Sequence, residues 1–164
     1  MGISAKFGVV AIAAVVAGAA LLSSETISAA MMGAEAVKAR QDAMKSMGKD
    51  MKAIQGFVKD GKGTAADVAT KAAAIAATAK GLPALFPKGS GRPDISDKDT
   101  RADPKIWTDW AGFEKDANFL VAEAGKLAEV ANGGDNKAIA AQFGKIGKEA
   151  CGGCHKTFRG EKVK

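Results

Sequence analysis

The residues best suited to chemistry lie in the last fourteen positions, in the run Cys151-Gly-Gly-Cys154-His155. His155 is the only histidine of the chain, and the only two cysteines stand beside it. Two thiols three positions apart can add to the two vinyl groups of one haem, and a histidine directly after them is placed to bind the iron. The run therefore predicts one covalently bound haem c, attached through Cys151 and Cys154, with His155 as an axial iron ligand.

Other chemistries use similar residues and fit less well. A structural zinc site takes four thiolate or imidazole ligands, and no Cys or His remains to complete that set. A redox dithiol normally follows a strand and opens a helix in an α/β pattern, which this sequence lacks. Haem enzymes need a general acid or base near an open metal site, and there is no second histidine. We therefore expect a haem protein that is not an enzyme.

The amino terminus has the order of a secretory signal peptide. Lys6 is followed by an apolar stretch over residues 7–22, a polar stretch over 23–26, and small residues ending at Ala29 and Ala30. We expect residues 1–29 to be the signal peptide, with cleavage after Ala29 or Ala30, and residues 30–164 to form one domain in the periplasm. The alternative is a protein tethered to the membrane by an uncleaved helix, because the apolar run is only slightly shorter than a membrane span.

Composition favours an all-α fold and a basic surface. The chain is rich in alanine and lysine, has no tyrosine, and carries a formal net charge of +6. Such a charge can attract nucleic acid, anionic lipid or an acidic protein. No block of basic residues or aromatic stacking platform is present, so we expect no nucleic-acid binding. We expect a redox partner protein with an acidic docking surface, met by lysines such as Lys45, Lys148 and Lys156.

Four helical patterns come after the expected cleavage site. The first covers about residues 34–59, and the second opens with a capping box at Thr64 and Asp67 and runs to Ala79. Residues 82–104 contain all four prolines and cannot form a regular helix. A third pattern covers residues 105–131, and a fourth begins at Asp135 or Asn136 and enters the haem motif. Two helical hairpins joined by one long connection predict an antiparallel four-helix bundle.

Together these motifs resemble a known family. A four-helix pattern with Cys-x-x-Cys-His near the carboxyl terminus is similar to class II cytochromes c, the cytochrome c' family. The stretches that carry the resemblance are Ala36-Val-Lys-Ala-Arg40-Gln41, Leu82-Pro83-x-Leu85-Phe86-Pro87, Pro104-Lys-Ile-Trp107, and Cys151 through Arg159. The resemblance covers nearly all of the chain after the signal peptide. It implies a four-helix haem protein, and relatives that pair through their first two helices make a homodimer possible.

The resemblance also divides the function between two forms. High-spin members leave the sixth iron position empty behind an apolar residue of the first helix and bind nitric oxide or carbon monoxide. Low-spin members fill it with methionine, and the register places Met44 there. We expect the low-spin form, a periplasmic electron carrier with His155 proximal and Met44 distal, with the gas-binding, five-coordinate form as the alternative. Periodicity alone favours Met44, Met47 and Met51 as core residues rather than ligands, and Met47 is the next candidate ligand after Met44.

Three further residues are candidates for the haem pocket. Arg40 lies one turn before Met44 and could pair with a haem propionate or be solvated at the edge of the helix seam. Arg159, four residues after His155, resembles the family's basic residue beside the proximal imidazole, or could be an exposed arginine at a helix end. Phe86 is a candidate for a pocket wall. These three complete the predicted site of Cys151, Cys154, His155 and Met44.

Overall fold

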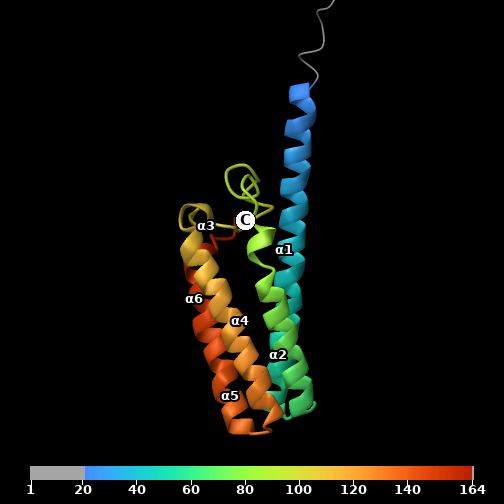
Figure 1. The fold of residues 1–164 in the computed structure, drawn as a ribbon, viewed down its shortest axis with the longest axis vertical. Helices are drawn as coiled ribbons and strands as arrows, with labels where there is room; N and C mark the ends of the chain where they lie inside the picture. The colour runs from blue at the N-terminus through green and yellow to red at the C-terminus, as the bar shows by residue number, and fades with distance from the viewer. Residues whose placement is uncertain (1–20, 164) are drawn as a thin grey trace, which may run out of the picture.

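The protein is an all-α, antiparallel four-helix bundle, as predicted. The computed structural model describes residues 21–163 of the chain, with side chains from residue 32 onward. The first hairpin consists of α1 (Leu21–Asp60) and α2 (Ala65–Lys80), and α4 (Trp110–Asn132) packs against α2. The fourth helix runs beside α4 and includes α5 (Asn136–Lys145) and α6 (Gly152–Phe158). In Figure 1 the first turns of α1 extend beyond the end of the bundle.

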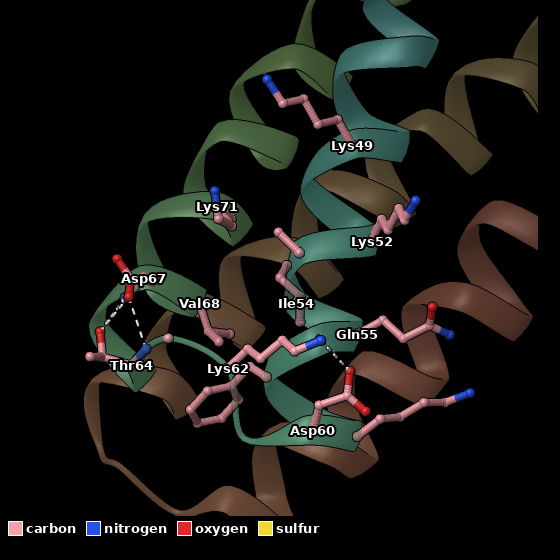
Figure 2. Close-up of a pocket in the computed structure, with 15 residues that line it drawn as sticks. Lys49, Lys52, Ile54, Gln55, Asp60, Lys62, Thr64, Asp67, Val68 and Lys71 are labelled. Carbon is pink, nitrogen blue, oxygen red and sulfur yellow. Dashed lines mark hydrogen bonds and ion pairs between the residues drawn. The ribbon is translucent and has the colours of Figure 1, made fainter.

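The turn between α1 and α2 confirms the predicted capping box. Gly61 and Gly63 adopt positive φ angles of 63° and 83°, which residues with a side chain rarely adopt. The backbone N–H of Asp67 donates to Thr64 Oγ1 at 3.1 Å, and the backbone N–H of Thr64 donates to Asp67 Oδ2 at 2.8 Å. Both bonds satisfy N–H groups that the first turn of α2 would otherwise leave unpaired. The short turn makes α1 and α2 antiparallel neighbours (Figure 2).

The proline-rich connection is irregular, as expected, apart from the short 3₁₀ turn η1 (Pro83–Leu85). The helix after it differs from the prediction, because it is broken into α3 (Lys105–Thr108) and α4. Asp109 stands at the break in a non-helical conformation, and its side chain accepts a hydrogen bond from the N–H of Gly112 at 3.1 Å. Aspartate is a favoured residue at a helix start, which explains a boundary that hydrophobic periodicity alone does not reveal.

The fourth helix changes its winding just before the haem motif. Asp135 caps α5 by accepting hydrogen bonds from the N–H groups of Lys137 and Ala138. After α5 the chain forms a π-helix, η2 (Ile146–Cys151), and then continues as α6. A π-turn holds one residue more than an α-turn, so it rotates everything after it around the helix axis. This segment therefore sets the direction in which Cys154 and His155 face.

The hydrophobic core has two parts. The larger cluster fills the bundle, with fully buried side chains that include Ile54, Ile75, Leu127 and Ile139. The smaller cluster lies where the connection meets α4 and α6 and consists of Phe86, Ala102, Ile106, Phe113 and Phe158. Its aromatic rings pack edge to face, with Phe113 4.8 Å from Phe86 and 5.5 Å from Phe158 between centroids. The smaller cluster surrounds the motif-bearing end of the fourth helix.

A buried carboxylate joins α4 to α5. Glu123 is only 2% exposed, and its carboxylate is 3.0 Å from both Lys126 Nζ and Lys145 Nζ. Gln142 Nε2 donates to the same carboxylate at 2.8 Å and to the Glu123 backbone carbonyl at 2.9 Å. The hydrogen bond from Gln142 and those from the two lysines lower the pKa of Glu123 to about 2. Sequence periodicity gives no signal for this network, since it depends on how two helices pack.

The expected signal peptide falls mainly on residues that the structure does not describe. Residues 1–20 lie outside the described part, so the prediction for residues 1–29 stays a prediction. Within residues 21–163, no helix is both long and apolar enough to span a bilayer.

Glu123 should make the stability of the protein depend on acid. Its pKa is lower in the folded protein than the ordinary value of 4.5, so its contribution is complete above pH 4.5 and is lost as the pH falls towards 2. We expect Glu123→Gln to be less stable than the parent at pH 7 and to lose less stability between pH 5 and pH 2, measured by urea unfolding. Identical pH profiles for the two proteins would contradict this role.

Candidate haem-binding site

A cavity of about 530 Å³ opens where the connection, α1 and α6 meet. Cys154 and His155 of α6 line it, and Met44 of α1 lines it as well. Its apolar wall comes from the smaller core cluster, through Phe86, Ile106, Phe113 and Phe158. The fold thus brings residues more than 100 positions apart in the sequence to one cavity.

The three motif residues are half-buried and carry little charge. Burial raises the pKa of the Cys151 thiol, and burial with nearby Asp116 and Cys151 raises the pKa of Cys154 to about 11. Burial also lowers the pKa of His155, helped by the positive charges of Arg159 and Arg101. A lowered pKa keeps the imidazole neutral at pH 7, the form that can bind a metal. Cys151 packs against the larger core cluster rather than lining the cavity.

The structure separates Met44, Met47 and Met51, the three methionines of α1 that recur on one helix face. Met44 is half-buried and lines the cavity, whereas Met47 is 7% exposed inside the larger core cluster. Met51 packs against the same cluster, and neither Met47 nor Met51 lines the cavity. Met44 is therefore the methionine that shares a cavity with His155.

Arg40 is buried, which corrects the option of a solvated arginine at the edge of the seam. Its side chain is 4% exposed and lies over the Phe86 ring, 4.9 Å from the centroid. It donates to Ser90 Oγ at 2.9 Å, to Thr100 Oγ1 at 2.6 Å, and to the Ser90 carbonyl. Ser90 and Thr100 were not predicted from the sequence, because irregular loops give no periodic signal of which hydroxyls become buried. Arg40 holds the connection against α1 and also lines the cavity.

Arg159 is exposed and ends the fourth helix. It lies after α6 in an extended conformation, so it does not continue the helical face of His155 as expected. The reason is a bridge to Ala102 of the connection, which draws the chain out of the helix. Arg159 still lines the cavity, and its charge contributes to the lowered pKa of His155.

The connection is fixed closely beside the cavity. Trp107 Nε1 donates to the Phe86 carbonyl at 3.0 Å, and a Cβ atom at Gly91 would lie only 2.1 Å from the Trp107 ring. Arg92 donates to the carbonyls of Thr100 and Asp97 and reaches that of Glu161. Gly91 is therefore needed for close packing, and the cavity wall is held from several sides.

This cavity suits a haem group in shape and chemistry. A haem is flat and apolar with two propionates at one edge, and the cavity has an apolar aromatic wall with a basic rim. The basic residues lining it are Arg40, Lys45, Lys98, Arg101, Arg159 and Lys162, against two acidic residues, Asp97 and Asp99. The residues present therefore fit a haem with its propionates towards the basic side.

A second cavity, of about 580 Å³, lies at the turn between α1 and α2 (Figure 2). Five lysines line it, Lys49, Lys52, Lys59, Lys62 and Lys71, together with Asp60 and Asp67. Lys62 pairs with Asp60 at 3.2 Å, and Asp67 is used by the capping box. It includes no cysteine, histidine or methionine, so it offers no attachment for haem.

Comparison with known proteins agrees with this site. The family model described as Cytochrome C' matches residues 35–159. The chain is 33% identical over 139 residues to a cytochrome c' of Allochromatium vinosum, covering 84% of this chain and 88% of that protein. It is 34% identical over 149 residues to cytochrome c-556 of Rhodopseudomonas palustris, covering 88% of this chain and 94% of the relative.

The solved structures give the same result. One cytochrome c', described as having an unusual ligand-controlled dimer dissociation, superposes with a TM-score of 0.69 at 32% identity. The match covers 79% of this chain and 97% of that structure. The fold and site define a class II cytochrome c. The chain belongs to the cytochrome c' family, and its cofactor is one covalently bound haem c, for which Cys151 and Cys154 supply the two thiols.

Removing the thiols should leave a labile protein. Haem bound in this cavity would cover the apolar wall formed by Phe86, Phe113 and Phe158, so a Cys151→Ala, Cys154→Ala variant would expose that surface to water. We expect its melting temperature to fall by about 5–10 °C, equivalent to roughly 2–3 kcal/mol. The Cys151→Ala variant keeps one thioether bond, so its melting temperature should lie between those of the parent and the double variant. Equal melting temperatures, measured by circular dichroism, would contradict a structural role for haem.

Proposed function

We propose that this protein is an exported haem c protein in which His155 binds the iron and the opposite face takes a small gas, nitric oxide or carbon monoxide. Two observations support this five-coordinate form. The relative from Allochromatium vinosum and the superposed solved structure are both named cytochrome c', and both are matched over most of their lengths. The solved structure is described as having a ligand-controlled dimer dissociation. The wall of the cavity that His155 lines is also apolar, through Phe86, Ile106, Phe113 and Phe158, which suits a small neutral gas.

Each residue of the site would have a separate task. Cys151 and Cys154 hold the macrocycle, and the neutral His155 imidazole supplies the proximal nitrogen. Met44 would stand over the distal face as an apolar side chain of α1 and limit what reaches it. Arg40 would face a propionate, and Phe86 would form part of the wall. Haem, when bound, supplies one-electron redox chemistry and an iron position for a diatomic ligand.

A second function is favoured by one specific observation. Met44 lines the same cavity as His155, and a thioether is a good ligand for haem iron. If Met44 binds the iron, the protein is a low-spin electron carrier, because both axial positions are filled. A soft, neutral thioether favours ferrous iron and raises the reduction potential. This candidate uses the same fold and the same attachment site as the first.

Optical spectra distinguish the two functions. For the five-coordinate form we expect high-spin bands in the ferric and ferrous states and ready binding of carbon monoxide. Met44→Ala should then keep the high-spin spectrum and change mainly the rate of gas binding. Low-spin bands, a weak far-red thioether band lost in Met44→Ala, and no response to carbon monoxide would overturn gas binding and establish the electron carrier.

Location, assembly and reactivity complete the proposal. The signal-like amino terminus supports a periplasmic protein, and an uncleaved tether is the alternative. A relative whose dimer dissociates under ligand control supports a homodimer. The single histidine is committed to the iron, so no histidine is left as a general acid or base, which supports a role without catalysis.

A redox partner would meet the basic mouth of the cavity. This mouth is formed by Lys45, Lys98, Arg101, Arg159 and Lys162, all exposed. Of the lysines named from sequence, Lys45 lies there, whereas Lys148 and Lys156 do not line the cavity. Asp97 lies at the mouth but is paired with Arg92 at 3.0 Å, which leaves the mouth positive. The charge supports an acidic partner surface, which would approach closest to the iron here.

Small redox ions can test the charge at the mouth. We expect Lys98→Gln with Lys162→Gln to slow oxidation by ferricyanide about twofold or more at low salt, because an anion is attracted less strongly. Oxidation by a cationic ruthenium ammine should become faster. The control is Lys49→Gln with Lys52→Gln at the second cavity, which changes net charge equally. Stopped-flow rates altered alike by both pairs would exclude the mouth as a docking surface.

A further inference from the structure

Arg40 is a buried cation without a counter-ion. It is 4% exposed, and no carboxylate lies within ion-pair distance of it among the side chains of residues 32–163. Buried charges in proteins are normally paired, because removing a charge from water is costly. Burial lowers the pKa of Arg40 to about 10, so it is still protonated at pH 7. The folded chain therefore maintains a positive charge that nothing in the described part of it neutralises.

Two buried hydroxyls hold this charge in place. Ser90 is 0% and Thr100 2% exposed. Ser90 Oγ accepts from one terminal nitrogen of Arg40, and Thr100 Oγ1 accepts from the other. Ser90 Oγ is itself oriented by donating to the Pro87 carbonyl at 2.7 Å. Neutral acceptors satisfy hydrogen bonds without cancelling the charge, which a carboxylate in either position would do.

The charge of Arg40 lies at the wall of the proposed haem cavity. Arg40 and Thr100 both line the cavity that contains His155, and Arg40 lies one helical turn before Met44. A positive charge beside a haem favours the reduced iron, which carries one positive charge fewer. Its effect depends on distance, so the side chains that fix the guanidinium also fix the size of the effect.

We propose that Ser90 and Thr100 are positioning residues, which hold the Arg40 guanidinium at the cavity wall as a positive charge that no carboxylate of the described residues neutralises, and thereby raise the reduction potential of the haem. This inference rests on the proposed haem site but not on the sixth ligand. It assigns a task to two loop hydroxyls that belong neither to the haem motif nor to the axial ligands. The connection is then part of the redox site as well as a link between hairpins.

The test compares reduction potentials of the haem-loaded protein at pH 7 and low salt, by spectroelectrochemical titration. Thr100→Val removes the acceptor and keeps the shape, and we expect the equilibrium constant for reduction to fall, on the order of threefold to tenfold. A tenfold fall corresponds to about 59 mV for one electron. Thr100→Ser keeps the hydroxyl and should restore the parent potential. If Thr100→Val does not fold, Ser90→Ala provides the same test through the other nitrogen.

Thr64→Ala is the matched control. Thr64 caps α2 by accepting from the N–H of Asp67, makes no bond to Arg40 or Thr100, and does not line the cavity. This variant should lower the melting temperature through loss of the cap while leaving the potential unchanged. An unchanged potential in Thr100→Val, or an equal shift in Thr64→Ala, would overturn the positioning role. A parent protein purified without covalent haem would instead overturn the proposed function, and the inference with it.

Discussion

The buried guanidinium of Arg40 is the interaction on which the arrangement of the site most depends. It joins α1 to a connection that has no regular structure of its own, through Ser90 and Thr100. That connection supplies Phe86 and Ala102 to the smaller core cluster. Without a fixed connection, the aromatic wall of the cavity that His155 lines would lack one side. Burying a cation to hold a loop costs desolvation free energy. A buried arginine at this position is consistent with a site that binds a group carrying two carboxylates.

The fourth helix imposes the second constraint. Glu123 fixes the end of α5 through Gln142 and Lys145, and the π-turn η2 begins immediately afterwards. Because the π-turn rotates the residues after it around the helix axis, the directions of Cys154 and His155 are set from a well-anchored position. Cys151 packs against the larger core cluster in the bundle interior, and Cys154 packs against the smaller cluster beside the cavity. The two attachment points for haem are therefore held by different parts of the core. The packing of α5 around Glu123 thus helps to set how Cys154 and His155 are presented to the haem cavity.

The sequence predicted the features that depend on local chemistry. The capping box, the four-helix architecture and the thiols for haem attachment are each recognisable from neighbouring residues, and each is confirmed, although the predicted helix ends are not all the observed ones. The break at Asp109 and the π-turn were not predicted, because a one-residue change in winding leaves the hydrophobic spacing almost unaltered. The burial of Arg40 and the extended conformation of Arg159 were also missed, since both are decided by a loop that contacts them from 50 or more positions away. Tertiary contacts of irregular segments have no signature in a single sequence.

Met44 shows why the fold and the haem attachment do not by themselves decide between gas binding and electron transfer. The bundle places Met44 in the same cavity as His155, and this placement is compatible with a filled or a free sixth iron position. In the proposed haem protein, the Met44 thioether and a diatomic gas would compete for the sixth iron position. Methionine is unbranched and flexible, so a half-buried Met44 can approach the iron or pack against the wall at little cost in conformational energy. Gas binding in such a site requires only that the thioether bond be weaker than the bond to the gas. The bundle would therefore place Met44 near the sixth iron position, and small differences in packing around Met44 would decide whether its thioether or a gas binds there.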